Sequence, residues 1–464
     1  MSTTHPAGSA AANAISGGFL DKSRTVAPHD YNRFTVPAAA LAVHLCIGQV
    51  YAFSTYNLPL TKLIGLTQSA SDDWSLVAIG WIFSTAILFL GLSAALFGRW
   101  VESAGPRKAM FVAAACFGGG FLVGAVGIYL HQLWILFLGY GVLGGCGLGI
   151  GYISPVSTLI KWFPDRPGMA TGMAIMGFGG GAMIAAPLSI FLMDHFKTST
   201  DNGVLGAFVA MGVLYFLFMS IGAISVRIPP TGWKPAGWNP SAHPKKLVTH
   251  AHVHVDVAWK TRQFWFLWGI LCMNVTAGIG VLGQASPMIQ EIFTGRVSPA
   301  SAASFVGLLS LFNMGGRFFW ASVSDYIGRR NTYFVFFLLG IALYASVPTL
   351  GSLGTIPWFV IAFGVILSMY GGGFATIPAY LRDLFGTMHV GAIHGRLLTA
   401  WAAAGVLGPV LVNYIRKFQI DSGVPKAQAY SVTMYIMCAL LLIGFICNLL
   451  VKPVDAQHHH ADNS

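Results

Sequence analysis

The sequence predicts an all-α membrane protein: a bundle of twelve transmembrane helices arranged in two six-helix halves. Three observations lead to this prediction. Only 9% of the 464 residues are charged while 55% are hydrophobic, apolar stretches recur from one end of the chain to the other, and one long polar stretch divides them evenly. A soluble domain carries about 25% charged residues, so lipid must replace water over much of this surface.

Each predicted span is long enough to cross about 30 Å of hydrocarbon as a helix. In chain order the spans are 34–57, 75–97, 109–129, 133–157, 169–193, 204–226, 264–288, 302–323, 332–351, 356–380, 397–415 and 430–451. The polar stretch contains several prolines, which is typical of a linker. The predicted organisation is an N-terminal tail (1–33), an N-terminal half (34–226), a cytoplasmic linker (227–262), a C-terminal half (263–452) and a C-terminal tail (453–464).

The positions of the basic residues decide how the net charge of +11 is interpreted. With the N-terminus inside, the cytoplasmic segments hold 19 of the 26 Lys and Arg, the periplasmic segments hold 6, and Arg317 lies within a span. This bias obeys the positive-inside rule, so we expect both termini in the cytoplasm and no nucleic acid as a partner. Residues 1–33 lack a hydrophobic run, so we expect no cleavable signal peptide and insertion into the bacterial inner membrane through the first span.

Two short segments repeat one pattern at corresponding places in the two halves. Each has an acid, a glycine three residues later, and then basic residues. The first, between spans 2 and 3, contains Gly98, Glu102, Gly105, Arg107 and Lys108, and the second, between spans 8 and 9, contains Asp325, Gly328, Arg329 and Arg330. We expect the glycine to form a tight turn and the basic pair to anchor it at the cytoplasmic interface. Two copies indicate duplicated halves.

Three further segments carry a family resemblance. They are GQVYAFS at 48–54, KWFPDRPGMATG at 161–172 leading to GFG at 177–179, and NMGGR at 313–317. Together with the repeated pattern, they make the chain resemble the major facilitator superfamily and, more specifically, the oxalate/formate antiporter family. The resemblance covers nearly all of residues 34–452. It implies alternating access to a central site between the halves, with small carboxylate anions as substrates.

Arg317 is the strongest candidate for a substrate-binding residue. It lies eight residues before Asp325, which is about 12 Å along a helix from the cytoplasmic turn. An arginine at that depth costs at least ~2.5 kcal/mol on insertion scales, and its guanidinium offers paired donors that match a carboxylate. All 15 Asp and Glu lie in loops, tails or span ends, so we expect no acid to pair with it within a span. The resemblance also implies a substrate-binding arginine here, with snorkelling to the interface as the alternative.

The sequence departs from the family pattern at one important position. Antiporters that handle the oxalate dianion pair that arginine with a lysine in span 11, where this chain has Trp401. One buried cation balances one negative charge, so we predict a monocarboxylate such as formate, pyruvate or lactate. The alternative is an oxalate or dicarboxylate exchanger that recruits a second cation, Arg396, from the cytoplasmic end of span 11.

Aromatic and amide side chains within the spans complete the expected site. A tyrosine can donate a hydrogen bond to a carboxylate while its ring packs against the carbon skeleton. The aromatic candidates are Tyr51, Tyr152, Tyr370, Phe374 and Trp401, and the amide candidates are Gln49, Asn274, Gln284 and Asn313. Helix packing or contact with lipid is the alternative for the aromatic residues, and hydrogen bonding between helices for the amides.

The lack of acids within the spans also bears on coupling, because many proton-driven transporters use a buried Asp or Glu. Here only His44 lies well inside a span, with His394 near a cytoplasmic end. We assign His44 to packing. Anion exchange, or symport in which the proton travels with the substrate, therefore fits better than a relay through acids.

Other function classes find little support in the sequence. There is no G-x-x-x-x-G-K-[ST] motif for ATP and no visible nucleophile or carboxylate pair, so we expect neither an enzyme nor a cofactor. A non-transporting carboxylate sensor stays an alternative, although the tails are short for a signalling domain. The histidines at 250, 252, 254 and 458–460, with Asp256, lack a cysteine companion and are assigned to solvated loops instead of a metal site. By analogy with the family we expect a monomer in the lipid bilayer.

Overall fold

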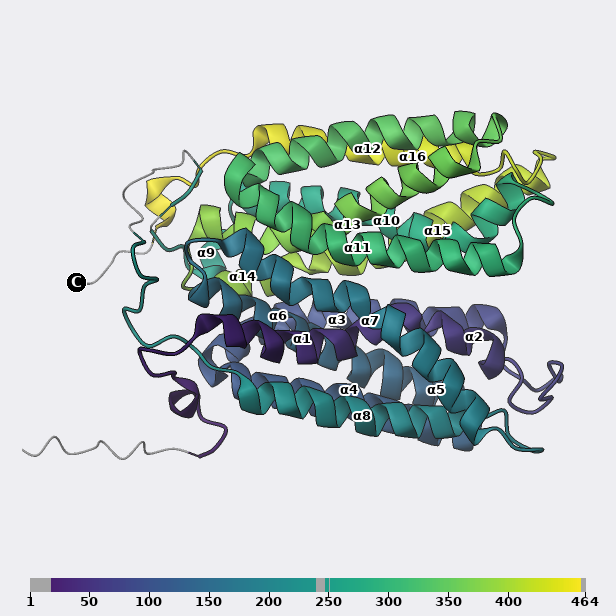
Figure 1. Cartoon of the computed structure of the whole chain (residues 1–464), viewed down its shortest axis with the longest axis horizontal. Coiled ribbons are helices and arrows are strands. Elements are labelled where there is room, and N and C mark those ends of the chain that lie inside the picture. The colour runs from purple at the N-terminus through teal and green to yellow at the C-terminus, as the bar shows by residue number, and fades with distance from the viewer. Residues whose placement is uncertain (1–17, 239–246, 250, 460–464) are drawn as a thin grey trace, which may run out of the picture.

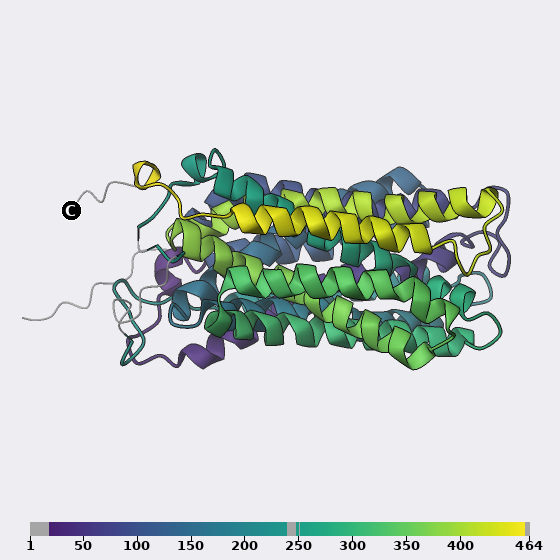
Figure 2. The same cartoon turned by 90° about the horizontal axis from the view of Figure 1, so that it is seen from above.

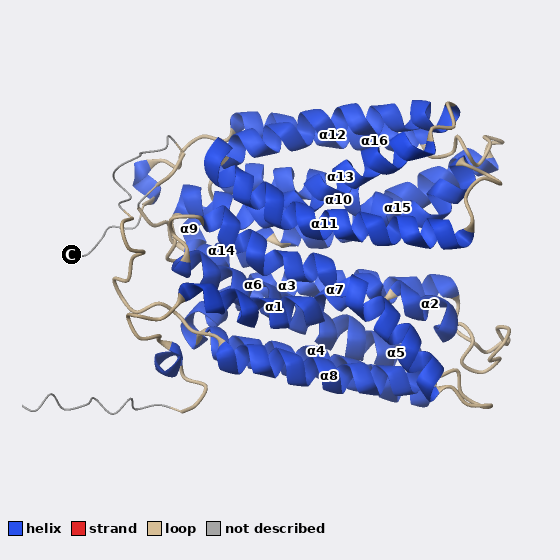
Figure 3. Ribbon diagram, in the orientation of Figure 1, coloured by secondary structure: helices blue, strands red, loops and turns tan. Residues whose placement is uncertain are grey.

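The computed structural model describes residues 18–238, 247–249 and 251–459. All regular elements within these ranges are helices. The long helices run side by side along one axis, and the colours of Figure 3 show loops gathered at the two ends of the bundle. Figures 1 and 2 place both described chain ends at the same end of the bundle, which we call the terminal end.

The N-terminal half contains the helices up to residue 225. They are α1 (Val36–Ile47), α2 (Ser54–Leu60), α3 (Leu76–Ala104), α4 (Pro106–Tyr129), α5 (Leu133–Leu136), α6 (Gly145–Trp162), α7 (Pro167–Phe196) and α8 (Val204–Ser225). The segment between α5 and α6, Phe137–Gly144, is π-helical and joins them into one continuous rod.

The C-terminal half follows a short helix in the linker, α9 (Val255–Ala258). Its helices are α10 (Arg262–Ile292), α11 (Pro299–Ile327), α12 (Arg329–Ser352), α13 (Ile356–Phe385), α14 (Val390–Leu397), α15 (Thr399–Asp421) and α16 (Ser431–Leu450). Figure 1 shows most of these helices as a group on one side of the bundle, with the N-terminal half on the other side.

The predicted all-α membrane bundle is confirmed. Within the described residues, 11 helical segments are long and apolar enough to cross a membrane. The remaining predicted span corresponds to α11, a helix of 29 residues that carries Asn313 and Arg317. Many large apolar side chains face outward, among them Phe191 (64% exposed) and Trp358 (63% exposed), as expected of a surface in contact with lipid.

The first predicted span is broken, which the hydropathy pattern does not reveal. Between α1 and α2 the chain forms a 3-10 helix, Gly48–Ala52. A Cβ added at Gly48 would lie only 2.4 Å from the carbonyl oxygen of Phe178, so glycine permits the close approach of α7. The break changes the direction in which the side chains of Gln49 and Tyr51 leave the helix.

Two further predictions about boundaries need correction. The predicted span 397–415 starts too late, because α14 begins at Val390 and includes the paired side chain of Arg396. The turns of the repeated motifs are also shorter than expected. Each is one glycine, with φ of +85° at Gly105 and +87° at Gly328, and the acids Glu102 and Asp325 belong to the last turns of the preceding helices.

The two halves pack closely at the terminal end and part toward the other end. A Cβ added at Gly98 of α3 would lie 2.9 Å from Ala392 of α14, and one at Gly91 would lie 2.7 Å from Ala402 of α15. At Gly80, near the other end of α3, a Cβ would meet nothing within 4 Å. The structure is therefore closed at the terminal end and open at the opposite end.

Candidate functional site

Arg317 lies on α11 at the boundary between the halves, with no exposed surface. Its Nε donates a hydrogen bond to Asn313 Oδ1 at 3.1 Å, and its Nη1 donates to the carbonyl oxygen of Ile175 at 3.4 Å. Its Nη2 has no hydrogen-bond partner in the described part of the chain. The guanidinium therefore stays inside the bundle instead of reaching an interface, and its Nη2 is available to donate a hydrogen bond to a ligand.

Glycines on the neighbouring helices make room for this side chain. A Cβ added at Gly179 of α7 would lie 2.8 Å from Arg317 Nε, and one at Gly371 of α13 would lie 3.0 Å from Arg317 Cγ. Small residues of this kind let transmembrane helices approach closely. As a result, one arginine of the C-terminal half touches helices from both halves.

Aromatic rings surround the guanidinium. Its Cζ lies 5.2 Å from the ring centroid of Phe374 and 5.6 Å from that of Phe178. The ring of Trp401 lies 4.5 Å from Phe374, and 5.3 Å separates it from the ring of Tyr152. These five side chains form what we call the arginine cluster. Cation–π contacts stabilise a cation that has no acid beside it.

Two more donors in the arginine cluster lack partners. The hydroxyl of Tyr152 and the Nε1–H of Trp401 are buried and make no hydrogen bond within the described residues. A buried donor left unsatisfied costs roughly 1–3 kcal/mol. Together with Nη2 of Arg317 they provide hydrogen-bond donors and one positive charge, so the arginine cluster suits a small anion with several acceptor oxygens.

A pair of tyrosines closes the arginine cluster from the open side. The hydroxyl groups of Tyr51 and Tyr370 lie 3.1 Å apart and share a hydrogen bond between the two halves. The tyrosine pair is thus a direct contact between the two halves.

A cavity of about 280 Å³ lies between the halves on the open side of this pair. Tyr51, Gly179 and Asn313 contribute to its inner wall, which places it directly beside Arg317. Farther out it is lined by amides, including Gln284 of α10 and Asn413 of α15. A polar solute entering from the open end would reach the tyrosine pair first.

The structure brings most of the predicted site residues together and separates two of them. Gln49 points into the N-terminal half, where its Oε1 accepts a hydrogen bond from Tyr140 at 3.0 Å. Asn274 lies against Gly373, since a Cβ there would be 2.3 Å from its Nδ2. Asn313 orients Arg317, so its amide is a positioning group in this state.

Three residues around Tyr152 had no site role in the sequence analysis, although His44 was assigned to packing. Phe178 belongs to the GFG segment, which carried the resemblance but had no assigned role. The ring of His44 stacks on Tyr152 at 5.2 Å, and its Nε2 contacts the Tyr152 carbonyl oxygen at 3.2 Å. His394, placed near a cytoplasmic end by the sequence, is only 1% exposed and lies 5.8 Å from the same ring. The sequence signal that could have indicated the position of the two histidines was their occurrence within apolar segments.

The terminal end is sealed by an acid of one half at a helix start of the other. Asp325 of α11 accepts hydrogen bonds from the backbone N–H of Gly168 at 2.9 Å and of Met169 at 2.8 Å, in the first turn of α7. The positive end of a helix dipole stabilises a carboxylate in this position. The contact therefore joins the halves when the terminal end is closed.

The other motif makes the reciprocal contact. Glu102 of α3 accepts hydrogen bonds from the backbone N–H of Gly391 at 2.8 Å and of Ala392 at 3.3 Å, in the first turn of α14. The two repeated motifs thus perform the same task in opposite directions. Their correspondence in space agrees with the duplication inferred from the sequence.

The sequence analysis expected the basic residues of both motifs to anchor the turns at the interface. This expectation is wrong for the first basic residue of each pair. Arg329 is only 7% exposed and pairs with Asp325 at 2.5 Å and with Asp383 at 3.2 Å. Arg107 is 4% exposed and donates to the carbonyl oxygen of Phe19 at 3.0 Å. The first basic residue of each pair is thus part of the packed interior, because nearby acceptors satisfy it.

Arg396 is engaged away from the arginine cluster. Its guanidinium pairs with Asp256 of the linker at 2.8 Å and donates to the carbonyl oxygen of Val255 at 2.8 Å. The other carboxylate oxygen of Asp256 pairs with Arg99 of α3. A linker acid therefore bridges the two halves at the terminal end, and Arg396 is not a second cation of the arginine cluster here.

A buried cation between two helical halves that meet at one end and part at the other defines a membrane carrier. Residues 40–409 match the family model of the Major Facilitator Superfamily. The chain belongs to this superfamily, and the protein is accordingly a multi-pass membrane transporter and not an enzyme.

Curated relatives with matching sequences include carriers of organic anions. The oxalate:formate antiporter of Oxalobacter formigenes is 27% identical over 81% of this chain and 82% of its own length. Apicoplast pyruvate carrier 1 of Toxoplasma gondii is 20% identical over 90% of this chain and 88% of its own length. Monocarboxylate transporter 12 of Rattus norvegicus is 24% identical over 70% of each chain.

Solved structures confirm the fold. A Major Facilitator Superfamily transporter in the outward conformation, the Escherichia coli fucose:proton symporter, superposes with a TM-score of 0.63 at 12% identity, over 90% of this chain and 99% of that one. A bacterial homologue of the iron transporter ferroportin in its outward-facing state gives 0.61 at 12% identity, over 89% and 98% of the chains.

Proposed function

We propose that the protein transports small monocarboxylate anions, such as formate, pyruvate or lactate, by alternating access, with Arg317 as the anchor for the carboxylate. The unpaired Nη2 of Arg317 beside the unpaired donors of Tyr152 and Trp401 carries this proposal. A carboxylate would satisfy the charge and the donors together.

The charge of the arginine cluster favours a monoanion. Arg317 is its only cation, because Trp401 occupies the position where the resemblance implies a lysine in oxalate carriers. A dianion would leave one buried negative charge without a partner, which is costly in a medium of low dielectric constant. The rings of Phe178 and Phe374 would pack against a short carbon skeleton.

Entry of the substrate would begin at the open cavity. Breaking the hydrogen bond between Tyr51 and Tyr370 frees both hydroxyl groups, and Tyr51 lines the inner wall of the cavity. A carboxylate can accept from a freed hydroxyl and from the guanidinium together, so binding offsets the loss of the tyrosine contact. The substrate thereby replaces a contact between the halves with one made through itself.

Passage to the other side requires the terminal end to open. The caps made by Asp325 and Glu102, and the bridge made by Asp256, all join the two halves and must break in that step. The contact energy released as the open end closes around the substrate would compensate for them. Without an acid in the arginine cluster, exchange of anions, or symport with the proton carried by the substrate, is the simplest coupling.

The charge bias assigns the sides of the membrane. The described parts of the linker and of both tails lie at the terminal end. Because the linker and tails hold much of the Lys and Arg excess, we assign that end to the cytoplasm of a bacterial inner membrane. In this assignment the structure is open to the periplasm. The boundaries 34–226 and 263–452 for the two halves, and a monomeric state, complete the proposal.

Exchange of oxalate or another dicarboxylate for formate is the second candidate, and the similarity to the Oxalobacter antiporter favours it. It needs a second cation near Arg317. Arg396, the sequence candidate, is held by Asp256 and Val255 in this structure. The second candidate therefore requires Arg396 to leave its ion pair during transport.

The test is uptake of radiolabelled pyruvate into proteoliposomes that contain wild type, Arg317→Gln or Arg296→Gln protein. Losing one charge-assisted hydrogen bond of about 1.5–3 kcal/mol, plus the charge, should lower the affinity at least ~10-fold. Arg296 is the matched control, because it is exposed, lies outside the arginine cluster and donates to the carbonyl oxygen of Gly354 at 2.9 Å.

Competition identifies the substrate class. Excess unlabelled lactate should abolish the pyruvate signal, while excess oxalate should leave most of it. If oxalate competes better than lactate, the dicarboxylate reading replaces ours. Uptake that survives Arg317→Gln would make Arg317 structural and remove carboxylates as the class.

A further inference from the structure

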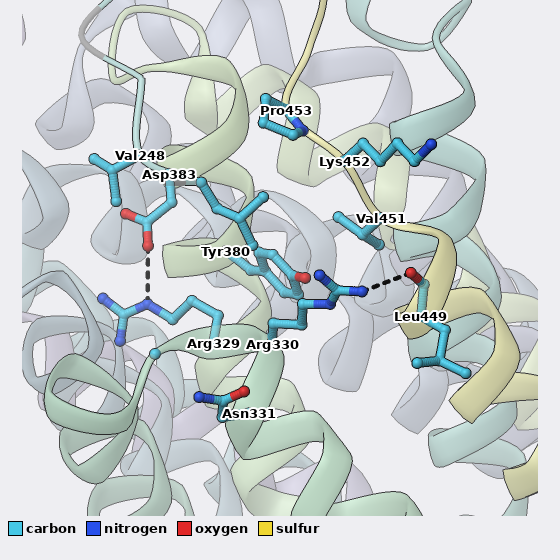
Figure 4. A pocket seen from close by; sticks show the side chains of 12 residues that line it. Val248, Arg329, Arg330, Asn331, Tyr380, Asp383, Leu449, Val451, Lys452 and Pro453 are labelled. Atoms are coloured by element: carbon cyan, nitrogen blue, oxygen red, sulfur yellow. Dashed lines mark hydrogen bonds and ion pairs between the residues drawn. The ribbon is translucent and has the colours of Figure 1, made fainter. Parts of the chain in front are cut away.

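A second cavity, of about 590 Å³, lies at the terminal end of the C-terminal half. The start of α12, the last turns of α13 and α16, and the linker residues Leu247 and Val248 form its walls (Figure 4). It shares no lining residue with the cavity beside Arg317. The proposed transport mechanism therefore leaves it without a role.

Two basic side chains of this cavity have donors to spare. Arg330 of α12 reaches across to the end of α16, where its Nη2 donates to the carbonyl oxygen of Leu449 at 2.6 Å (Figure 4). Its Nε is buried and has no hydrogen-bond partner among the described residues. Lys452 is exposed and makes no ion pair or hydrogen bond within the described ranges.

The single acid of the cavity does not cancel these charges. Asp383 pairs with Arg329 at 3.2 Å and with Arg382 at 3.1 Å. Its negative charge is thus balanced within the packed interior, and Arg330 and Lys452 leave the cavity with a surplus of positive charge. The hydroxyl of Tyr380, which also lines the cavity, donates to Asn448 Oδ1 at 3.4 Å.

An apolar surface leads directly to this basic cavity. On α16, Leu442, Ile446 and Leu449 are 50%, 46% and 44% exposed, and their spacing places them on one face of the helix. One turn of α12 after Arg330, the ring of Phe334 packs against that of Phe445 of α16, with 5.4 Å between the ring centroids. The cavity is thus the polar end of a stripe that faces lipid.

We propose that this cavity binds the phosphate headgroup of an anionic phospholipid, with Arg330 and Lys452 as its ligands and the acyl chains along α16. Guanidinium and ammonium groups at one interface are the usual partners of phosphate, and basic pockets between transmembrane helices recognise anionic headgroups. A soluble phosphate shares the headgroup chemistry but has nothing to place on the apolar stripe. The combination therefore points to the lipid as the source.

The position of this headgroup site gives it a link to transport. Arg329, which lines the same cavity, also holds Asp325, the acid that caps α7 of the other half. A bound phosphate at Arg330 would keep the start of α12 in place next to this contact. We therefore expect the lipid to favour the state that is closed at the terminal end.

The test measures retention of dioleoyl phosphatidylglycerol relative to dioleoyl phosphatidylcholine on purified, detergent-solubilised protein by native mass spectrometry. The wild type should prefer the anionic lipid. Each cation beside the bound headgroup contributes about fivefold to binding of an anionic lipid, so Lys452→Gln should lower the preference about fivefold and Lys452→Gln with Arg330→Gln about 25-fold. The control Lys417→Gln with Lys426→Gln removes two charges at the opposite end and should keep the wild-type preference.

Glycerol phosphate, added as a soluble competitor, distinguishes the two sources. It should not displace the lipid at millimolar concentration; if it does, the site takes soluble phosphates and the lipid assignment is wrong. Because Arg330 also ties α12 to α16, the double variant could fold poorly, and Lys452→Gln then decides alone. A preference that is unchanged in Lys452→Gln, or reduced equally in the control, overturns the proposal.

Discussion

Removing the charge of Asp325 should open the terminal end. Its carboxylate accepts two backbone hydrogen bonds from the start of α7, at 2.9 Å and 2.8 Å, across the boundary between the halves. Asp325→Asn keeps the shape of the side chain but replaces the carboxylate with one carbonyl oxygen and one donor. That donor faces backbone N–H groups, so one hydrogen bond is lost and the other becomes neutral.

The size of the effect follows from these two bonds. A hydrogen bond to a charged group contributes about 1.5–3 kcal/mol and a neutral one about 0.5–1.5 kcal/mol. The closed state would lose at least about 2 kcal/mol relative to the state open at the terminal end, which is roughly a 30-fold shift in their ratio. The pair between Asp325 and Arg329 lies within one half and largely cancels between the states.

A cysteine at the boundary reports the shift. Ala321 has no exposed surface, and its Cβ faces α7, lying 3.2 Å from the place a Cβ on Gly172 would take. In a variant without the native cysteines, the rate at which N-ethylmaleimide labels Ala321→Cys follows the population of the opened state. Asp325→Asn should raise that rate about 30-fold.

The matched control is Asp421→Asn, which removes the same charge from an exposed position at the opposite end. Circular dichroism should show unchanged helix content in both variants. An increase of less than about threefold for Asp325→Asn, or the same increase for the control, would refute the idea that the cap at α7 holds the terminal end closed.

Three more outcomes follow from the geometry. Gly316→Ala should lower the midpoint of thermal unfolding, because its Cβ would lie 2.1 Å from the carbonyl oxygen of Ser368 and overpacking costs about 1–3 kcal/mol. The control Gly315→Ala should leave the midpoint unchanged, because its Cβ would meet nothing within 4 Å. Equal midpoints for the two variants would contradict this packing. Trp401→Lys should make oxalate an effective competitor of pyruvate uptake. A folded variant whose pyruvate uptake oxalate does not inhibit would contradict the idea that the number of buried cations selects the charge of the substrate. His44→Gln should keep pH-driven uptake at about half or more of the wild-type rate, whereas its collapse would make His44 a proton carrier.

The fold was predictable because lipid imposes a simple rule on the sequence. Backbone groups in hydrocarbon must be satisfied within a helix, so apolar runs of sufficient length reveal the spans. The rule fails where polar groups find partners inside the protein. Arg396 and His394 are satisfied or buried in α14, so this helix starts seven residues before the predicted boundary of 397. The break at Gly48 depends on the approach of α7, which no local pattern records.

The candidate site was predictable only in part. Arg317 was recognisable because a buried arginine is costly, and the tyrosines because their hydroxyl groups need partners. Gln49 has the same polarity as Asn313, yet it turns to Tyr140 while Asn313 holds Arg317. The direction in which each amide side chain points depends on the rotation of its helix about the helix axis. Packing between helices that are distant in the sequence decides this rotation. The same holds for Phe178, whose role appears only beside the guanidinium.

The seal at the terminal end has an unusual mutational profile. Its donors are the backbone amides of Gly168, Met169, Gly391 and Ala392, which every residue except proline possesses. Exchanging the side chains of the two helix starts would therefore leave these four bonds available, and a systematic scan would register only the acids that accept them. Proline at Met169 or Ala392 would be the informative substitution, because it deletes a donor without altering any charge. The donors of this contact thus belong to the backbone, so a comparison of side chains between sequences detects only its acceptors.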